Sequence, residues 1–238
     1  MKIIPAPSPN FNERPAGGAI DILLMHYTGM KTGAEAIARL CDPTAKVSSH
    51  YVVEENGDVF ALVPEEKRAW HAGHSYWAGE TDINSCSIGI EIVNPGHEFG
   101  YRDFPGAQIT AVEELSRAIL ARHGIQPSRV IGHSDVAPAR KEDPGERFPW
   151  EQLARAGIGL WPDVAAKQAR YNDAGDVLMR IGYEKPESTE ELRSVLTAFQ
   201  RHWVPRAIGT PRQGVAESET LAVMNAVAEA IGKSGPTS

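Results

Sequence analysis

Two histidines and an aspartate occupy positions in this chain that suit a bound metal ion. His26 lies near the end of the apolar run ILLMHY, and His133 ends the run VIGH. Sites in open sheets form where strands end, and two imidazoles there suit a divalent transition metal. Asp143 lies in the loop after His133 and would be the most economical third ligand. Such a set leaves one position of a zinc tetrahedron open for water, as in catalytic sites.

The same residues also have ordinary structural explanations. A lone histidine is usually structural or exposed, and an aspartate before a proline commonly begins a turn. Pro144 and Gly145 would bend the loop back toward the sheet in either case. The spacing alone therefore leaves both a metal site and a solvated loop open.

Glu91 and Lys141 are the candidates for catalytic groups. Glu91 interrupts the alternating run SIGIEIV (87–93), whose isoleucines share one face. A carboxylate there either faces water at a sheet edge or is held with a raised pKa, which suits a general base beside a zinc-bound water. Lys141 is two residues from Asp143 and is either a solvated lysine or a positive charge for a developing oxyanion.

The segment AWHAGHSYWAGE (69–80) brings Trp70, His71 and further aromatic rings among small residues. Such a segment forms either a packed loop or the wall of a groove on which sugar rings stack. The groove makes Trp70 and His71 candidates for substrate binding.

Strands and helices alternate around these residues, which predicts an α/β domain with a mixed sheet. Asn56 and Gly57 predict a type I′ hairpin turn. Capping-box spacing predicts helix starts at Thr32 and Thr110. The expected strands are 21–27, the two arms of 50–63, 87–93 and 129–133, and the expected helices are 32–40 and 110–124, the latter ending at Gly124.

The ends of the chain differ in composition from its middle. Residues 1–19 are rich in proline, glycine and asparagine and predict an extended arm before a domain at 20–162. Residues 165–182, 188–203 and 216–232 predict three amphipathic helices, which form a small bundle at 165–232. The tail 233–238 is expected to fray.

Composition excludes several classes of protein. The net charge of −7 argues against a nucleic-acid partner, and no apolar run is long enough to span a membrane. Prolines interrupt the apolar start of the chain, so no secretory signal is predicted and a cytoplasmic location is expected. Cys41 and Cys86 predict two small buried residues rather than a disulfide.

As a set, these residues resemble the type 2, zinc-dependent N-acetylmuramoyl-L-alanine amidases, the AmpD/AmiD group related to phage T7 lysozyme and the peptidoglycan recognition proteins. The matching stretches are LLMHYTG, SSHYVVEENGDVFALVPEEKRAWHAG, NSCSIGIEIVNPG and IGHSDVAPARKEDPGERFPW. The resemblance implies a central mixed β-sheet flanked by helices. Residues 165–232 more weakly resemble the helical peptidoglycan-binding module of AmiD-type enzymes.

Carried over by position, the resemblance implies zinc on His26, His133 and Asp143, with Glu91 as the catalytic carboxylate and Lys141 as the stabilising charge. The resemblance also implies substrate-binding roles. Arg140 matches a family arginine that contacts the stem-peptide carboxylate, and His50 and His71 match positions that line or support the groove.

The implied activity is hydrolysis of the amide bond between N-acetylmuramic acid, or its 1,6-anhydro form, and L-Ala. The module is that of AmiD-type enzymes, whereas the expected cytoplasmic location is that of AmpD enzymes. We therefore expect muropeptide fragments from wall recycling as substrate. The alternatives are an amidase acting on intact peptidoglycan, a zinc hydrolase for another amide, and a recognition protein that binds muropeptides without cutting them.

Overall fold

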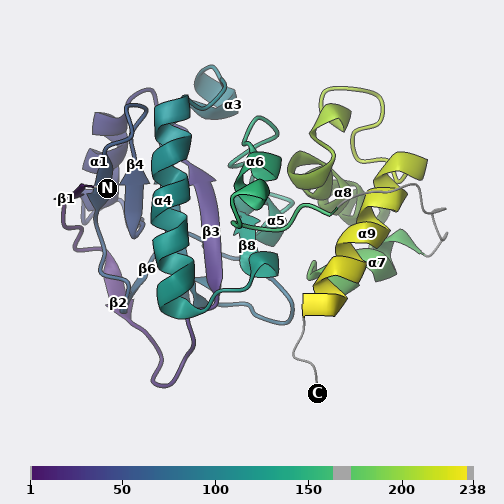
Figure 1. Cartoon of the computed structure of the whole chain (residues 1–238), viewed down its shortest axis with the longest axis horizontal. Coiled ribbons are helices and arrows are strands. Elements are labelled where there is room, and N and C mark those ends of the chain that lie inside the picture. The colour runs from purple at the N-terminus through teal and green to yellow at the C-terminus, as the bar shows by residue number, and fades with distance from the viewer. Residues whose placement is uncertain (1, 163–172, 235–238) are drawn as a thin grey trace.

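A six-stranded mixed β-sheet forms the centre of the computed structural model, which describes residues 2–162 and 173–234 (Figure 1). Its strand order is β1-β5-β4-β7-β3-β8, and β5 runs antiparallel to β4 while the other neighbouring pairs are parallel. The expected mixed sheet is therefore confirmed. The strands are β1 (Ile3–Pro5), β3 (Ile22–Tyr27), β4 (Tyr51–Val53), β5 (Val59–Ala61), β7 (Ser87–Ile92) and β8 (Val130–Gly132), with a separate antiparallel pair of β2 (Phe11–Glu13) and β6 (Lys67–Ala69).

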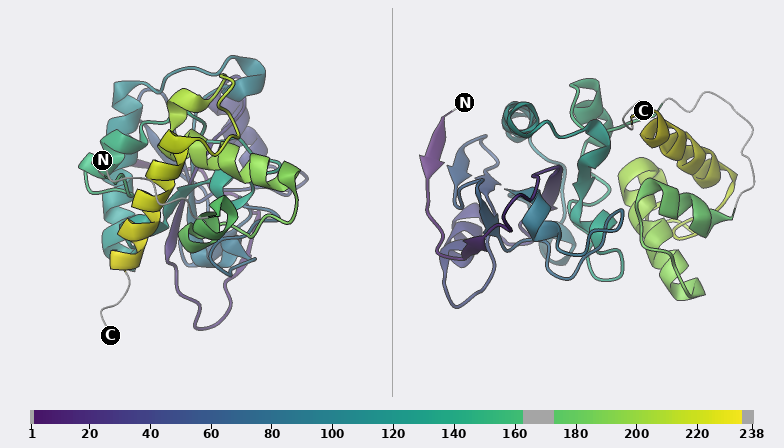
Figure 2. Two further views of the ribbon diagram at one scale, coloured as in Figure 1. Left: turned by 90° about the vertical axis from the view of Figure 1, so that its right-hand side faces the viewer. Right: turned by 90° about the horizontal axis from the view of Figure 1, so that it is seen from below.

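Helices cover both faces of this sheet. The long helix α4 lies across one face, and α7, α8 and α9 gather beyond the β8 edge (Figures 1 and 2). The helices are α1 (Gly33–Cys41), α2 (Ile83–Cys86), α3 (Gly96–Phe99), α4 (Gly106–His123), α5 (His133–Val136), α6 (Trp150–Arg155), α7 (Ala174–Ile181), α8 (Thr189–Trp203) and α9 (Ser218–Ser234), with 3₁₀ turns η1 (Pro127–Arg129) and η2 (Pro205–Ala207).

Side-chain alternation along β3 assigns each residue to one face of the sheet. Leu23 is buried in the core that includes α4, whereas Leu24 is buried in the core that includes α7, α8 and α9. His26 continues the Leu24 face, and the strand register places it opposite Glu91 of β7. The alternating sequence of β7 thus puts isoleucines against α4 and its polar residues beside His26.

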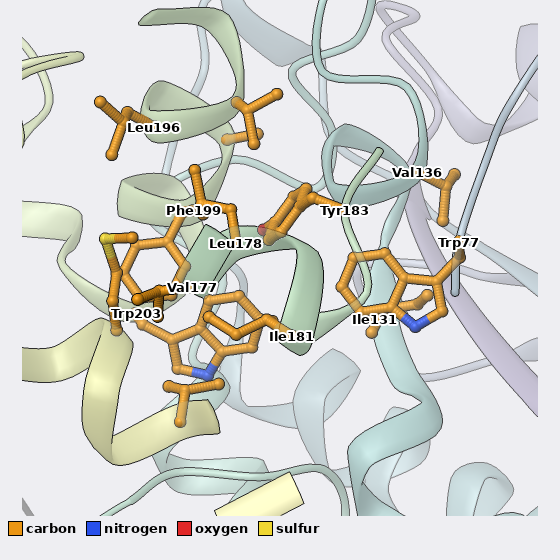
Figure 3. Close-up of a cluster of buried hydrophobic side chains, with 14 of the residues drawn as sticks. Trp77, Ile131, Val136, Val177, Leu178, Ile181, Tyr183, Leu196, Phe199 and Trp203 are labelled. Carbon is orange, nitrogen blue, oxygen red and sulfur yellow. The ribbon is translucent and has the colours of Figure 1, made fainter. Parts of the chain in front are cut away.

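The C-terminal helices share a hydrophobic core with the sheet. Trp77, Ile131 and Val136 from the N-terminal part of the chain are buried in one cluster with Phe199 and Trp203 of α8 (Figure 3). The sequence predicts a separate bundle at 165–232. That this bundle folds independently of the sheet stays a prediction. The first bundle helix begins at Ala174, and residues 165–172 lie outside the described part.

Two local predictions are wrong for identifiable reasons. The 50–63 hairpin forms, but Gly57 alone has positive φ, at 90°, and closes a three-residue loop. A type I′ turn would need positive φ at Asn56 as well. Helix α4 begins at Gly106 after Pro105, so Thr110 lies inside it and bonds the Gly106 carbonyl.

The two predicted helix caps are confirmed. Thr32 caps α1 by accepting a hydrogen bond from the Glu35 N–H, and Gly124 ends α4 with φ of 67°. Cys41 and Cys86 are free thiols, although both are half-buried rather than buried. Within the described ranges, no helix combines the length and apolar character needed to cross a membrane.

The shared core predicts cooperative unfolding. Phe199 is fully buried, so Phe199→Ala should lower the free energy of unfolding by about 3–5 kcal/mol. Denaturation followed by tryptophan fluorescence and circular dichroism should give one coincident transition for the whole chain. Val215 is 47% exposed, and Val215→Ala should change stability by under about 0.5 kcal/mol. Two separate transitions, with only one sensitive to Phe199→Ala, would contradict the shared core.

Candidate active site

The chemically active side chains meet at the carboxyl ends of the central parallel strands. His26 lies near the end of β3, Glu91 near the end of β7, and His133 directly after β8. Parallel neighbours end at the same edge of a sheet, so residues far apart in sequence come together there. Asp143 reaches this edge through the loop that follows α5, and its backbone carbonyl accepts a hydrogen bond from Ser134 N–H at 2.8 Å.

Three electron-pair donors converge at this edge. His26 Nδ1 lies 2.9 Å from His133 Nδ1 and 3.1 Å from Asp143 Oδ2, and His133 Nδ1 lies 2.9 Å from the same oxygen. All three residues are buried, and they form a group that could hold a metal ion. The structure thus brings together the three residues that the sequence selected.

The hydrogen bonds of the other ring nitrogens indicate what belongs between these donors. His133 Nε2 lies 3.0 Å from the Ala72 carbonyl oxygen, which can only accept. A neutral His133 therefore carries its proton on Nε2 and points the Nδ1 lone pair at the Asp143 carboxylate. Two acceptors facing each other at 2.9 Å call for a proton or a metal ion between them. Two imidazole nitrogens and one carboxylate oxygen are a donor set that fits zinc.

The protonation states also suit a metal site. Burial, and then the neighbouring His133, lower the pKa of His26 to about 4. Burial opposes ionisation of Asp143, but His133 and His26 outweigh it and hold the pKa of that carboxyl well below its usual range. A neutral imidazole and an ionised carboxylate are the forms in which His26 and Asp143 would bind a metal ion.

His71 lies behind the first of these histidines. Its Nδ1 is 3.0 Å from His26 Nε2, and its Nε2 is 3.3 Å from Ser87 Oγ, which donates to the Ile83 carbonyl oxygen at 2.5 Å. This chain of hydrogen bonds fixes the ring orientation of His26, as outer partners of metal-binding histidines do. A Cβ on Gly89 would lie 2.6 Å from His71 Nδ1, so the glycine makes room for the ring.

Glu91 presents an unpaired carboxylate oxygen near the three donors. Its Oε2 is buried and has no hydrogen-bond partner among the described residues. Burial and the Asp143 carboxylate raise the pKa of Glu91 well above its ordinary value, and Lys141 opposes them. A carboxyl group whose pKa is raised by burial is suited to general acid–base chemistry.

An open cleft of about 670 Å³ gives access to these groups. One wall is the loop that carries Lys141 and Asp143, and α3 forms part of the rim. The cleft is lined by Tyr27, Thr28, Gly29, Met30, Ala36, Arg39, Leu40, Val47, His71, Glu91, His97, Glu98, His133, Arg140, Lys141, Glu142 and Asp143.

The candidate substrate-binding residues lie in different surroundings. Arg140 and His71 line the cleft, whereas Trp70 and His50 are not among its lining residues. Arg140 donates to the backbone carbonyls of Ala72 and His74 through Nε and Nη2. Their roles in substrate binding stay predictions.

His50 and Trp70 are held by neighbouring protein groups. His50 is buried, and it accepts from Gly89 N–H at 2.9 Å and lies 3.0 Å from an Arg14 guanidinium nitrogen. Trp70 Nε1 donates to Asn12 Oδ1 at 2.6 Å, which ties this ring to the N-terminal arm. His50 thus has the surroundings of a residue that supports the groove, which is one of the two roles, lining or supporting, that the resemblance implied.

Sequence reasoning missed several residues that support the site. Arg14 donates to the carbonyl oxygens of Glu65, Asn84, Ser85 and Ser87 beneath the histidines. Asp135 and His202 form a buried contact beside His133. The polar alternation of β7 was the one available signal for Ser87 and Gly89, because both share a face with Glu91. No local pattern marks Arg14 or His202.

A mixed sheet carrying this donor triad and a free carboxylate in an open cleft is the arrangement of a metal-dependent hydrolase. The family profile described as N-acetylmuramoyl-L-alanine amidase matches residues 16–146. The chain is 40% identical to the N-acetylmuramoyl-L-alanine amidase AmiD of Escherichia coli K12, over 90% of this chain and 84% of that relative. The chain belongs to the N-acetylmuramoyl-L-alanine amidase family, which confirms the resemblance read from its sequence.

Other relatives and solved structures agree. The 1,6-anhydro-N-acetylmuramyl-L-alanine amidase AmpD of Haemophilus influenzae is 31% identical over 61% of this chain and 86% of its own length. The E. coli AmiD complex with anhydro-N-acetylmuramic acid-L-Ala-D-gamma-Glu-L-Lys superposes with a TM-score of 0.79 at 36% identity, covering 94% of this chain and 98% of that one. AmpDh3 of Pseudomonas aeruginosa with anhydromuramic pentapeptide gives 0.81 at 34% identity, over 91% and 94%.

The donor triad predicts how metal binding responds to substitution. Asp143→Ala removes the anionic donor, so zinc affinity should fall by more than the 10- to 100-fold that loss of an outer partner typically costs. Chelator competition measures this affinity. Asp103 is an exposed aspartate paired with Arg147, and Asp103→Asn should leave it unchanged. Equal affinities for the two variants would reject Asp143 as a ligand.

Proposed function

We propose that this chain is a zinc-dependent amidase that hydrolyses the bond between the lactyl group of N-acetylmuramic acid, or its 1,6-anhydro form, and L-Ala of muropeptides. The convergence of His26 Nδ1, His133 Nδ1 and Asp143 Oδ2 beside the unpaired Glu91 carboxylate carries this proposal. The bound fragments in the AmiD and AmpDh3 structures support the choice of substrate.

Each protein group has a defined task in this reaction. When bound by His26, His133 and Asp143, zinc would supply a Lewis acid for the amide carbonyl and lower the pKa of water. Glu91 accepts a proton from the attacking water and delivers it to the departing L-Ala nitrogen. Lys141 lines the same cleft, and its ammonium group stabilises the negative charge that develops on the carbonyl oxygen.

The environment of Glu91 supports this double role. Its raised pKa brings the protonated form within easier reach, as a group that both takes up and returns a proton requires, and Lys141 limits the rise. His71 keeps the His26 ring in place through the hydrogen bond to Nε2. The reaction therefore uses a rigid set of groups on strands and one loop.

We propose released muropeptide fragments, and a place in cell-wall recycling, for this enzyme. The cleft of about 670 Å³ is of the size that encloses a small ligand, and both complexes named above hold anhydromuropeptides. Binding of wall polymer by the C-terminal helices and the cytoplasmic location stay predictions; fractionation of the cells that make the protein tests the second.

Product analysis tests the activity. The protein is incubated with anhydromuropeptides and with intact sacculi, each with and without chelator, and products are identified by mass. The proposal predicts a free sugar and a free stem peptide from the fragments, lost with chelator and restored by zinc. A protein that binds the fragments and leaves them intact with zinc present is a recognition protein, and the proposal fails.

Glu91→Gln separates catalysis from metal binding. The amide cannot accept the proton of the attacking water, so kcat should fall by about 10²–10⁴-fold while zinc content stays at that of the unaltered protein. Glu151 is an exposed residue of α6 that pairs with Arg155 and does not line the cleft, and Glu151→Gln serves as the matched control with nearly full activity. Retained turnover in Glu91→Gln would refute its role as the proton acceptor.

A further inference from the structure

Helix α8 contacts both chain segments that carry the donor residues after β8. Two consecutive side chains make these contacts: His202 reaches α5, and Arg201 reaches the loop of residues 137–149. His133 opens the first segment and Asp143 lies in the second. Through α8, the C-terminal helices therefore contact the two segments that hold His133 and Asp143.

The His202 contact is buried. His202 Nδ1 lies 2.7 Å from Asp135 Oδ2, and the two side chains are 2% and 0% exposed. Tyr183, which follows α7, donates to Asp135 Oδ1 at 2.5 Å, and Gly132 N–H donates to Oδ2 at 2.8 Å. Asp135 is two residues from His133 on the same short helix, so these bonds orient the turn that presents His133.

Ring stacking holds the far end of the loop against the same histidine. The His202 ring lies between Trp150 and Trp203, with centroid distances of 3.8 and 3.6 Å and interplanar angles of 21° and 3°. Trp150 begins α6, where the loop ends, and Trp203 ends α8. The stack thus fixes the point at which the loop re-enters the core.

Arg201 holds the middle of the loop. Its side chain is 12% exposed and forms ion pairs, with Nη2 3.5 Å from Glu142 and Nε 4.0 Å from Glu146, while Nε makes no hydrogen bond within the described residues. His97 of α3 lies 3.2 Å from the Glu142 carboxylate and 3.1 Å from that of Glu146, from the other side. Glu142 stands between Lys141 and Asp143, so a shift of Glu142 would move both.

The loop is held by its own turns and by contacts to neighbouring elements. Residues 137–149 contain turns and no strand, and a loop without regular structure depends on tertiary contacts for its conformation. Catalytic groups lose activity when they are displaced by about 1 Å, so such contacts have functional weight. The contacts to α3 hold one side of the loop, and those to α8 hold the other.

We propose that Arg201 and His202 are positioning residues, through which α8 sets the geometry of His133, Lys141 and Asp143. The C-terminal helices then contribute to catalysis by positioning site residues, in addition to any binding of wall polymer. This inference rests on the proposed function, because it assigns the contacts to the same reaction.

Substitutions of Arg201 test the loop contact. Arg201→Gln should lower kcat on a small anhydromuropeptide by about 10-fold and weaken zinc binding by a similar factor, with a small change in KM, whereas Arg201→Lys should recover most of both. Arg206, 74% exposed, pairs with Glu219 in the same module, and Arg206→Gln is the matched control with unchanged values.

A second pair of variants covers loss of folding. Glu142→Gln breaks the ion pair from the loop side and should reproduce the Arg201→Gln effect, and the double variant should show little further loss. His202→Phe keeps the stack and loses the bond to Asp135, and it too should weaken zinc binding. Thermal unfolding of each variant shows that the comparison uses folded protein.

The outcomes separate this inference from the proposed function. If the unaltered protein binds zinc and cleaves its substrate while folded Arg201→Gln, Glu142→Gln and His202→Phe match Arg206→Gln in kcat and zinc affinity, α8 has no positioning role. If the unaltered protein neither binds zinc nor cleaves muropeptides, the proposed function itself fails. A selective loss of kcat and zinc affinity, reversed by Arg201→Lys, supports the inference.

Discussion

Three buried electron-pair donors facing one another are the constraint on which this structure depends. His26, His133 and Asp143 lie within hydrogen-bond distance of each other with little access to water, an arrangement that is unfavourable unless a proton or a metal ion joins them. Their convergence therefore needs a frame that resists relaxation. The parallel strands, His71, and the contacts to α8 supply that frame.

The alternation of side chains along the strands positions the site residues on one face of the sheet. One face of β3 and β7 is apolar and packs on α4, which leaves the other face free to carry His26 and Glu91 side by side. On that second face, one apolar cluster around Leu40 and Val52 and another around Phe199 lie apart from each other. The polar site thus occupies the part of the face that neither cluster covers.

The sequence predicted what local pattern determines. The ends of predicted strands pointed to His26 and His133, and the Pro-Gly turn after His133 pointed to Asp143. The alternation of β7 marked Glu91 as an unusual residue in an apolar strand. Long-range contacts could not be predicted from the sequence. The bond of His202 to Asp135, for example, joins residues 67 positions apart and has no periodic pattern. The start of α4 was misread because capping-box spacing recurs inside helices, and Pro105 decided the boundary.

The coordination of zinc in the reconstituted protein tests the central claim most directly. X-ray absorption at the zinc edge resolves the ligand elements and the scattering pattern of imidazole rings. The account predicts nitrogen and oxygen ligands only, with two imidazoles per zinc, and loss of one imidazole in His133→Ala. A sulfur ligand from Cys41 or Cys86, or zinc bound with no imidazole, would contradict it.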